Sequence, residues 1–441
     1  MGQQGCQFLQ LQSEQVQTSS SDSDDLQISQ ENFDKQQKIQ NQISSEKKQF
    51  QQFIEQLLNE KAQEGMISEK GSVPIELKQK LMKSIDQFKD SQEIKDYHPG
   101  SNNMVRDIIH QSLFPYQNMP GNQVQQQNPE TEKFYNNLQE SYNEDNIIKQ
   151  NIFTDFFGRE FCGSLRYQWL PSNMEMQQDG KYKYTSYINN LPEQNVELKE
   201  NLQELFNIFV PKFQQIFIEY LSKIKFSDWE EEQYFFKTLP CATFSSKPEV
   251  ILDKMKKLQV ITKIVDYEMY GQDTYNGVWH VEGMSHENII ATGVYFINID
   301  KEIEGGQLYY KRNFTKDERV FLGDYEKQII EDFSKPLGSL KTEEDLIIAF
   351  PNSHIHRLGT IKNVSQDKNQ CKKRRIIAFF IVNPFTRIIS TQTQPEQQGQ
   401  ISYQQACDIR LSMMEQRRYV KVKLNSGVEK MEERTVNLCE H

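Results

Sequence analysis

The sequence predicts an α+β protein in which helices buttress a β-sandwich or jelly roll. Most of the β signals fall between residues 250 and 390, as short apolar runs rich in Val, Ile, Phe and Tyr. Before residue 250, apolar side chains recur mainly at helical spacing. No repeat of about 20 to 50 residues is visible, so a solenoid or propeller is not predicted. Helices followed by a run of strands are typical of α+β proteins.

Composition indicates a folded body with polar extensions. The 441 residues are 36% hydrophobic and 11% aromatic, which is enough for a core over most of the chain, yet the mean hydropathy is −0.75. The net charge of −11 argues against general binding to a nucleic-acid backbone, which requires clustered Lys and Arg. The longest apolar run, residues 376–382, is too short for a transmembrane segment.

The six cysteines are scattered without paired spacing, which is typical of free thiols in a reducing compartment. We therefore expect a cytoplasmic protein, with the nucleus as the alternative. Residues 1–45 are rich in Gln and Ser and lack apolar periodicity, so they are predicted to be a disordered tail. Such a tail is a candidate surface for protein partners.

Residues 46–245 are predicted to form a helical and mixed region that packs on the core. Apolar spacing predicts helices from about residue 46 and over 75–88, 131–150 and 196–224. Two strands about a glycine turn are predicted at 165–170 and 181–188. His98 and His110 lie in a stretch punctuated by Pro and Gly, and we interpret both as structural residues.

Residues 246–441 are predicted to form the β domain, with a helix near the C-terminus. Its strands are predicted at 251–265, 289–299, 307–312, 345–350 and 374–382.

A candidate metal site lies in WHVEGMSHENIIATGVYFI, residues 279–297. His280 and Glu282 are two apart in a run of β-formers, so on a strand both side chains leave the same face. Non-haem Fe(II) oxygenases use two histidines and one carboxylate with open positions, which requires a second histidine on another strand. AFPNSHIHRLG supplies His354 and His356, which alternation places on one face.

Several blocks resemble one family. They are DYHPGSNNMVRDIIHQSLFPY, YQWLPSNMEMQQDGKYKYTSYINNL, WHVEGMSHENIIATGVYFIN, FPNSHIHRL, RRIIAFFIVNP and the terminal NLCEH. In this order they resemble the DUF4246 family of uncharacterised eukaryotic proteins, which is itself similar to the Fe(II)/2-oxoglutarate-dependent oxygenases. The resemblance runs from about residue 50 to the end. It implies a double-stranded β-helix, a jelly-roll variant, with Fe(II) between its two sheets.

The resemblance also implies a ligand set. HVE places His280 and Glu282 as the first two iron ligands, and the second histidine of HIHR, His356, falls in the family's His-Arg position as the third. His354 is the competing third ligand.

The same resemblance places the co-substrate. In RRIIAFFIVNP, Arg374 takes the position that holds the distal carboxylate of 2-oxoglutarate, because a guanidinium binds a carboxylate bidentately. Arg375 is then expected to face outward, and the cluster 372–375 to be otherwise solvated. Thr292 is a weaker candidate contact beside the co-substrate, on one strand face with Phe296.

The implied activity is that of a dioxygenase using Fe(II), 2-oxoglutarate and dioxygen. It would hydroxylate or oxidatively demethylate a substrate and release succinate and CO₂. The substrate class stays open between a protein, a nucleic acid and a small molecule, with specificity expected in loops such as 313–340. Two alternatives are an inactive jelly-roll binding module and a zinc-type metallohydrolase. The strand-borne arginine favours the oxygenase, since a hydrolase does not need it.

Overall fold

The computed structural model describes residues 64–117, 167–222, 247–283, 287–313, 334–385 and 387–425, with short pieces at 37–38, 41, 45, 152–154 and 160–162. By its internal contacts the chain divides into two compact units, Met1–Gln56 and Leu57–His441. All the strands and helices named below belong to the second unit. The predicted tail and the helices predicted from residue 46 and over 131–150 lie almost entirely outside the described residues.

One antiparallel sheet of eight strands organises the second unit. Its order is β1-β15-β11-β18-β9-β7-β8, and β2 also pairs with β9. The strands are Ile67–Lys70 (β1), Val105–Ile109 (β2), Ser172–Met176 (β7), Tyr182–Tyr184 (β8), Lys257–Met269 (β9), Ile289–Ile299 (β11), Leu346–Pro351 (β15) and Lys372–Val382 (β18). Strands from both sides of the predicted boundary at residue 246 therefore share one sheet, and the boundary itself stays a prediction.

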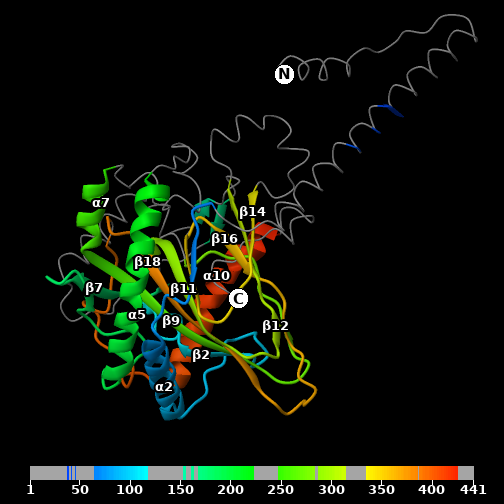
Figure 1. The fold of residues 1–441 in the computed structure, drawn as a ribbon, viewed down its shortest axis with the longest axis horizontal. Helices are drawn as coiled ribbons and strands as arrows, with labels where there is room; N and C mark the ends of the chain where they lie inside the picture. The colour runs from blue at the N-terminus through cyan, green and yellow to red at the C-terminus, as the bar shows by residue number, and fades with distance from the viewer. Residues whose placement is uncertain are drawn as a thin grey trace, which may run out of the picture. The chain divides into compact units, whose positions relative to one another are not determined.

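Helices cover one face of this sheet. They are Ile75–Ser91 (α2), Val196–Gln215 (α5), the π-helix Ile216–Leu221 (η2) and Pro248–Met255 (α7), and Figure 1 shows α2, α5 and α7 along one side of the strands. Phe206 and Phe209 of α5 meet Phe379 of β18 edge-on, at ring distances of 5.4 and 5.5 Å. Gly293 of β11 makes room for this contact, because a Cβ there would lie 2.7 Å from Phe209.

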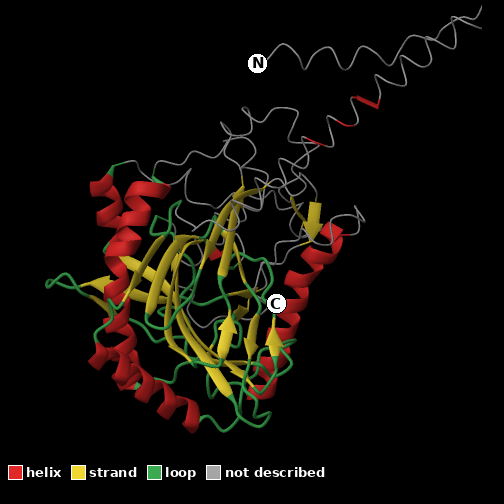
Figure 2. Cartoon of the chain, turned by 45° about the vertical axis from the view of Figure 1, so that its right-hand side comes forward, coloured by secondary structure: helices red, strands yellow, loops and turns green. Residues whose placement is uncertain are grey.

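The other face of the sheet packs against a smaller sheet. The smaller sheet has the order β14-β13-β16 and consists of Ser334–Leu340, Leu308–Asn313 and Ile355–Leu358. A second apolar cluster joins the two sheets, with Val294 and Phe380 on one side and Leu308 and Tyr310 on the other. The helix Tyr403–Asn425 (α10) adds Met413 to this cluster. Figure 2 shows helices on both sides of the strands.

The remaining strands are short. Thr274–Tyr275 (β10), Ile361–Asn363 (β17) and Ile303–Gly305 (β12) form a three-stranded sheet, and the two-stranded pairs are Tyr116–Gln117 (β3) with Tyr167–Gln168 (β6) and Ile152–Thr154 (β4) with Glu160–Cys162 (β5). The structure thus has the predicted mixture of helices and antiparallel sheets.

Two predicted strands are wrong in their bounds. Residues 251–255 belong to α7, because Pro248 starts a helix there and Ile251 and Met255, four apart, bury one helical face. The hairpin about Gly180 pairs β7 with β8, whereas in 165–170 only β6 is a strand. The helices predicted at 75–88 and 196–224 and the strands predicted at 289–299, 307–312, 345–350 and 374–382 are confirmed to within three residues.

Among the described residues, no helix combines the length and the apolar character that crossing a membrane requires. Cys371 and Cys407 carry free thiols.

Candidate active site

A cavity lies between the large sheet and the smaller one. Its polar lining consists of two histidines, one carboxylate and two cations, and the rest is apolar or aromatic. The lining residues are Lys263, Tyr267, His280, Glu282, Val294, Phe296, Leu308, Phe350, His356, Leu358, Arg374, Ile376, Ala378 and Phe380.

The backbone brings His280 and His356 together. Their N–H groups donate to each other's carbonyl oxygens at 2.9 Å, which makes an isolated antiparallel bridge. The sequence argument assumed that His280 and Glu282 share a strand, but among the described residues of this segment only His280 forms a β-bridge, and the next strand, β11, begins at Ile289 as predicted. The two histidines are nevertheless paired across two segments, as the ligand set required.

Asn352 holds the loop that carries Glu282. The Glu282 N–H donates to Asn352 Oδ1 at 2.9 Å, and Asn352 Nδ2 donates to the carbonyl oxygens of Glu282 and Ile289 at 2.8 and 3.0 Å. These three hydrogen bonds, rather than strand pairing, position the carboxylate. Alternation within a strand therefore does not explain why His280 and Glu282 converge.

The ring nitrogens of the two histidines are oriented so that they could hold a metal ion. Nδ1–H of His280 donates to Val278 O at 2.8 Å, and Nδ1–H of His356 donates to His354 O at 3.1 Å. In the neutral rings, the lone pair is then on Nε2. Both Nε2 atoms lie 3.6 Å from Glu282 Oε1, and the three ligand atoms are within 4.8 Å of one another.

Electrostatics keep the Glu282 carboxylate charged and the His356 imidazole neutral. Burial alone would raise the pKa of Glu282, but the two histidines, whose Nε2 atoms lie 3.6 Å from Oε1, and then the charge of Lys263 lower it by more, so that it lies far below its usual range. Burial, and then the nearby His280, lower the pKa of His356. Glu282 Oε2 is buried and has no hydrogen-bond partner in the part of the chain that the structure describes. Such an atom is costly unless a cation contacts it.

His354 lies elsewhere. It precedes β16 in a turn, where its N–H donates to Pro351 O, and its Nε2–H donates to Glu64 O at 2.6 Å. Burial lowers the pKa of His354 to about 4. The structure therefore brings His356, and not His354, to His280 and Glu282.

Arg374 points into the cavity. Its side chain is 1% exposed, and its two Nη atoms both donate to Gly306 O at 3.2 Å. Among the described residues, Arg374 Nε has no hydrogen-bond partner and no carboxylate forms an ion pair with the Arg374 guanidinium. Burial lowers the pKa of Arg374 to about 10, so the guanidinium stays charged at neutral pH.

Arg375 faces the opposite side, as predicted, but that side is not solvent. Its side chain is buried, and its Nε and Nη2 donate to the two oxygens of Asp266 at 2.6 and 2.8 Å. Nη2 also donates to Asp86 of α2. Lys372 pairs with Glu302. The prediction of an outward Arg375 in a solvated cluster is therefore wrong, because α2 covers this end of β18.

Thr292 and Phe296 share the inner face of β11, and Phe296 lines the cavity. Thr292 is buried and its Oγ1 has no hydrogen-bond partner within the described ranges, but it does not line the cavity.

Sequence reasoning missed Lys263, Asn352 and Tyr310. Lys263 lies between the apolar Ile261 and Val265 on the inner face of β9, and its charge helps to lower the pKa of Glu282. That face could have been recognised, since a cation inside an alternating apolar pattern is unusual. Tyr310 is fully buried and stacks on His356 at a ring distance of 6.1 Å.

Comparison with solved structures finds low similarity to oxygenases. A prolyl hydroxylase from Trichoplax adhaerens, in complex with a hypoxia inducible factor peptide fragment, is 8% identical over 77% of this chain and 92% of that chain, with a TM-score of 0.27. A prolyl-4-hydroxylase from Pseudomonas putida is 7% identical over 76% and 99%, with a TM-score of 0.26.

A Burkholderia pseudomallei oxidoreductase of the 2OG-Fe(II) oxygenase family is 10% identical over 49% and 66%, with a TM-score of 0.24. At these TM-scores the similarities do not bear on the function of the chain.

Among curated proteins, none is significantly similar in sequence. A sequence model of one family, described as Protein of unknown function (DUF4246), matches residues 36–233 and 219–405. Together these segments run from residue 36 to residue 405 of the 441, far more than half, and the chain therefore belongs to the DUF4246 family.

Proposed function

We propose that the chain is an Fe(II)- and 2-oxoglutarate-dependent dioxygenase that hydroxylates its substrate, or demethylates it through such a hydroxylation. The observation that carries the proposal is Arg374. Its charged guanidinium is buried in the same cavity as His280, Glu282 and His356 and has no carboxylate partner among the described residues. A buried charge of this kind needs a counterion, and a dicarboxylate co-substrate supplies one.

The residues present fit Fe(II). Two neutral imidazoles and one carboxylate are the ligand types of a non-haem Fe(II) site that leaves positions open for other ligands. The unpartnered Oε2 of Glu282 is a further polar atom that a cation would contact. When bound, Fe(II) would supply the activation of dioxygen, a redox chemistry that side chains do not provide. Zn²⁺ could occupy the same ligands, so the metal alone does not separate an oxygenase from a hydrolase.

The protein's contribution to the metal site is orientation. The carbonyl oxygens of Val278 and His354 accept from Nδ1–H and so fix the tautomer and the direction of both rings. Asn352 fixes the main chain at Glu282. Partners of this kind typically change metal affinity by about 10- to 100-fold when removed.

The contribution of Arg374 is to hold the carboxylate of 2-oxoglutarate that does not face the metal. A carboxylate binds a guanidinium more strongly than the neutral Gly306 carbonyl does, because both partners are charged. Gly306 makes room at this point: a Cβ there would lie 2.0 Å from Arg374 Nη1. Apolar lining, including Phe296 and Phe380, keeps water from the reacting groups.

The overall reaction then balances as substrate, dioxygen and 2-oxoglutarate giving hydroxylated substrate, succinate and CO₂. The double-stranded β-helix is part of the proposal, since the two facing antiparallel sheets are compatible with it.

The test is an anaerobic titration of 2-oxoglutarate into the Fe(II)-loaded protein, followed by the metal-to-ligand charge-transfer band. Arg374→Ala should bind Fe(II) like the unmodified protein but lose affinity for 2-oxoglutarate. Losing a charge-assisted bidentate contact in a buried cavity costs on the order of 2 to 4 kcal/mol, or roughly 30- to 1000-fold in Kd.

The matched control is Lys373→Ala, which removes a neighbouring positive charge from the same strand but on its other, partly exposed face. It should leave the Kd for 2-oxoglutarate unchanged. Equal affinity in Arg374→Ala and the unmodified protein would refute the role of Arg374. Absence of the band in every variant would favour a hydrolase or a binding module instead.

A further inference from the structure

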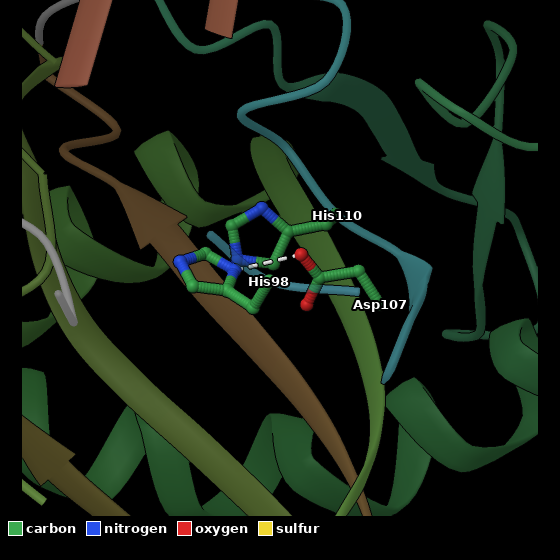
Figure 3. A group of neighbouring side chains, drawn as sticks. All are labelled: His98, Asp107 and His110. Carbon is green, nitrogen blue, oxygen red and sulfur yellow. Dashed lines mark hydrogen bonds and ion pairs between the residues drawn. The ribbon is translucent and has the colours of Figure 1, made fainter. Parts of the chain in front are cut away.

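A second group of ligand-type side chains lies outside the cavity. His98, Asp107 and His110 are all buried, and one nitrogen or oxygen atom of each lies within 4.8 Å of the others. None of the three lines the cavity between the sheets. Figure 3 shows the two imidazole rings and the carboxylate turned toward one another.

The segment before β2 places His98 beside Asp107. Tyr97 forms an antiparallel bridge with Arg106, and the His98 N–H donates to Val105 O at 2.8 Å. In an antiparallel pair, His98 is then the diagonal neighbour of Asp107 on the same face, within reach of its side chain.

A β-bulge adds His110. Asp107 and His110 are three residues apart, so in a regular strand their side chains would leave opposite faces. The pairing of β2 with β9 shifts register between Asp107 and Ile109. The extra residue reverses the alternation and returns His110 to the face of Asp107, as bulges beside functional sites often do.

The donor atoms suit a metal ion. His98 Nδ1 lies 2.7 Å from Asp107 Oδ2. His110 Nδ1 lies 2.6 Å from Ser112 Oγ and accepts from the Ser112 N–H at 3.2 Å, so a metal ion at its Nε2 requires the ring hydrogen to move to Nδ1 and to be donated to the Ser112 hydroxyl. The other oxygen of the carboxylate, Asp107 Oδ1, is buried and has no hydrogen-bond partner among the described residues. A metal ion would satisfy that orphaned atom.

The charges around the group also favour a cation. Arg410 of α10 donates to both oxygens of Asp96 at 2.9 and 2.8 Å and to Asp107 Oδ2 at 3.5 Å. Among the described residues, two buried carboxylates therefore share one guanidinium, and with neutral histidines these groups carry one uncompensated negative charge. Either a bound cation or a proton on a histidine or on Asp96, whose pKa burial raises, compensates it, and a metal-binding experiment distinguishes the cation from the proton.

We propose that His98, Asp107 and His110 bind a divalent transition metal ion, with Zn²⁺ as the ion that two imidazoles and a carboxylate suit. Binding replaces the hydrogen bond from His98 Nδ1 to Asp107, and the ligating nitrogen and oxygen would then lie roughly 3.3 Å apart, as in a tetrahedral zinc site. The ion ties the segment before β2 to the strand, and Arg410 extends this link to α10. The site is structural and does not depend on the proposed oxygenase activity.

The experiment uses the full chain with the cavity site disabled by His280→Ala and His356→Ala. After chelation and dialysis this variant is titrated with ZnCl₂, and with CoCl₂ as a spectroscopic probe. We expect about one zinc ion per chain by elemental mass spectrometry, visible d–d absorption with cobalt, and a Tm that rises with added Zn²⁺ because only the folded state binds it.

Adding His98→Ala and His110→Ala should abolish zinc binding, cobalt absorption and the Tm increase. The matched control adds His354→Ala instead, since that buried histidine belongs to neither group, and should keep all three signals. A folded chain with the cavity site disabled that binds neither metal would overturn the proposal and leave a hydrogen-bonded network with a protonated histidine or a protonated Asp96. That result needs no substitution at the new site, so it stands even if the further variants fail to fold.

Discussion

Replacing Arg375 by Ala removes one partner of a buried, bidentate ion pair. Arg375 Nε and Nη2 donate to the two Asp266 oxygens at 2.6 and 2.8 Å, and the side chains are 3% and 0% exposed. After the change, Lys89 at 2.7 Å is the ion-pair partner that Asp266 keeps among the described residues. Breaking a buried pair costs about 3 to 5 kcal/mol, because the remaining charge stays desolvated. Since Lys89 still compensates part of that charge, we expect the lower end, about 3 kcal/mol.

Urea unfolding of the full chain, followed by circular dichroism at pH 7, measures this loss. The control is Lys70→Ala, which breaks the exposed pair with Glu343 and should leave the unfolding midpoint unchanged. The double variant Arg375→Ala with Asp266→Asn should be less destabilised than the sum of the two single changes. Each single change leaves one charged partner buried without the other, whereas the double variant removes both charges. A loss for Arg375→Ala as small as that of the control would refute the argument.

The same ion pair predicts a pH dependence. Burial alone would raise the pKa of Asp266, but Arg375 and then Lys89 lower it more, so that it lies below its usual value. A carboxyl whose pKa is lowered by folding stabilises the native state above its unfolded pKa, about 3.9, and this contribution is lost as the pH falls toward the folded pKa. Between pH 5 and pH 3, roughly the window on either side of that unfolded pKa, the unmodified protein should therefore lose more unfolding free energy than Arg375→Ala.

Three further outcomes are expected. Gly306→Ala should displace the Arg374 guanidinium, because Gly306 has φ +73° and an added Cβ would lie 2.0 Å from Arg374 Nη1. The anaerobic titration should then show weaker 2-oxoglutarate binding while Fe(II) stays bound, and an unchanged affinity would contradict this. His356→Ala should lose most of the iron and His354→Ala should retain it, since the latter ring bonds Glu64 O; the reverse result by iron assay would show that the histidines are misassigned. Deleting residues 1–45 should leave the Tm and the iron content unchanged, because the tail lacks the apolar residues that offset its ordering entropy, and a large fall in Tm would refute this.

The spacing of apolar residues was sufficient to predict the elements that bury one continuous apolar face. The apolar run at 289–299 became β11 and the helical stripe at 75–88 became α2, because the period of the apolar residues selects the element whose one face can be buried. The HVE spacing and the histidines of HIHR likewise contained the residues that meet in the cavity.

Contacts between distant segments could not be predicted in this way. Alternation separates Arg374 from Arg375 but does not say that α2 will cover the second face. The sequence therefore predicted a solvated charge where the structure has a buried ion pair. The choice between His354 and His356 depended on where β16 begins and on Glu64, 290 positions away in the chain.

The sequence by itself determined the type and order of most elements and the residues available for a metal. Only the tertiary structure decided which of them meet. A bulge in β2 reversed the alternation of side chains along the strand and brought His110 to Asp107. Glu282 lies in a loop outside any strand, and its hydrogen bonds with Asn352 position it. The physical reason is that periodicity specifies the face of a side chain relative to its own element, whereas burial and partners depend on the elements packed against that face.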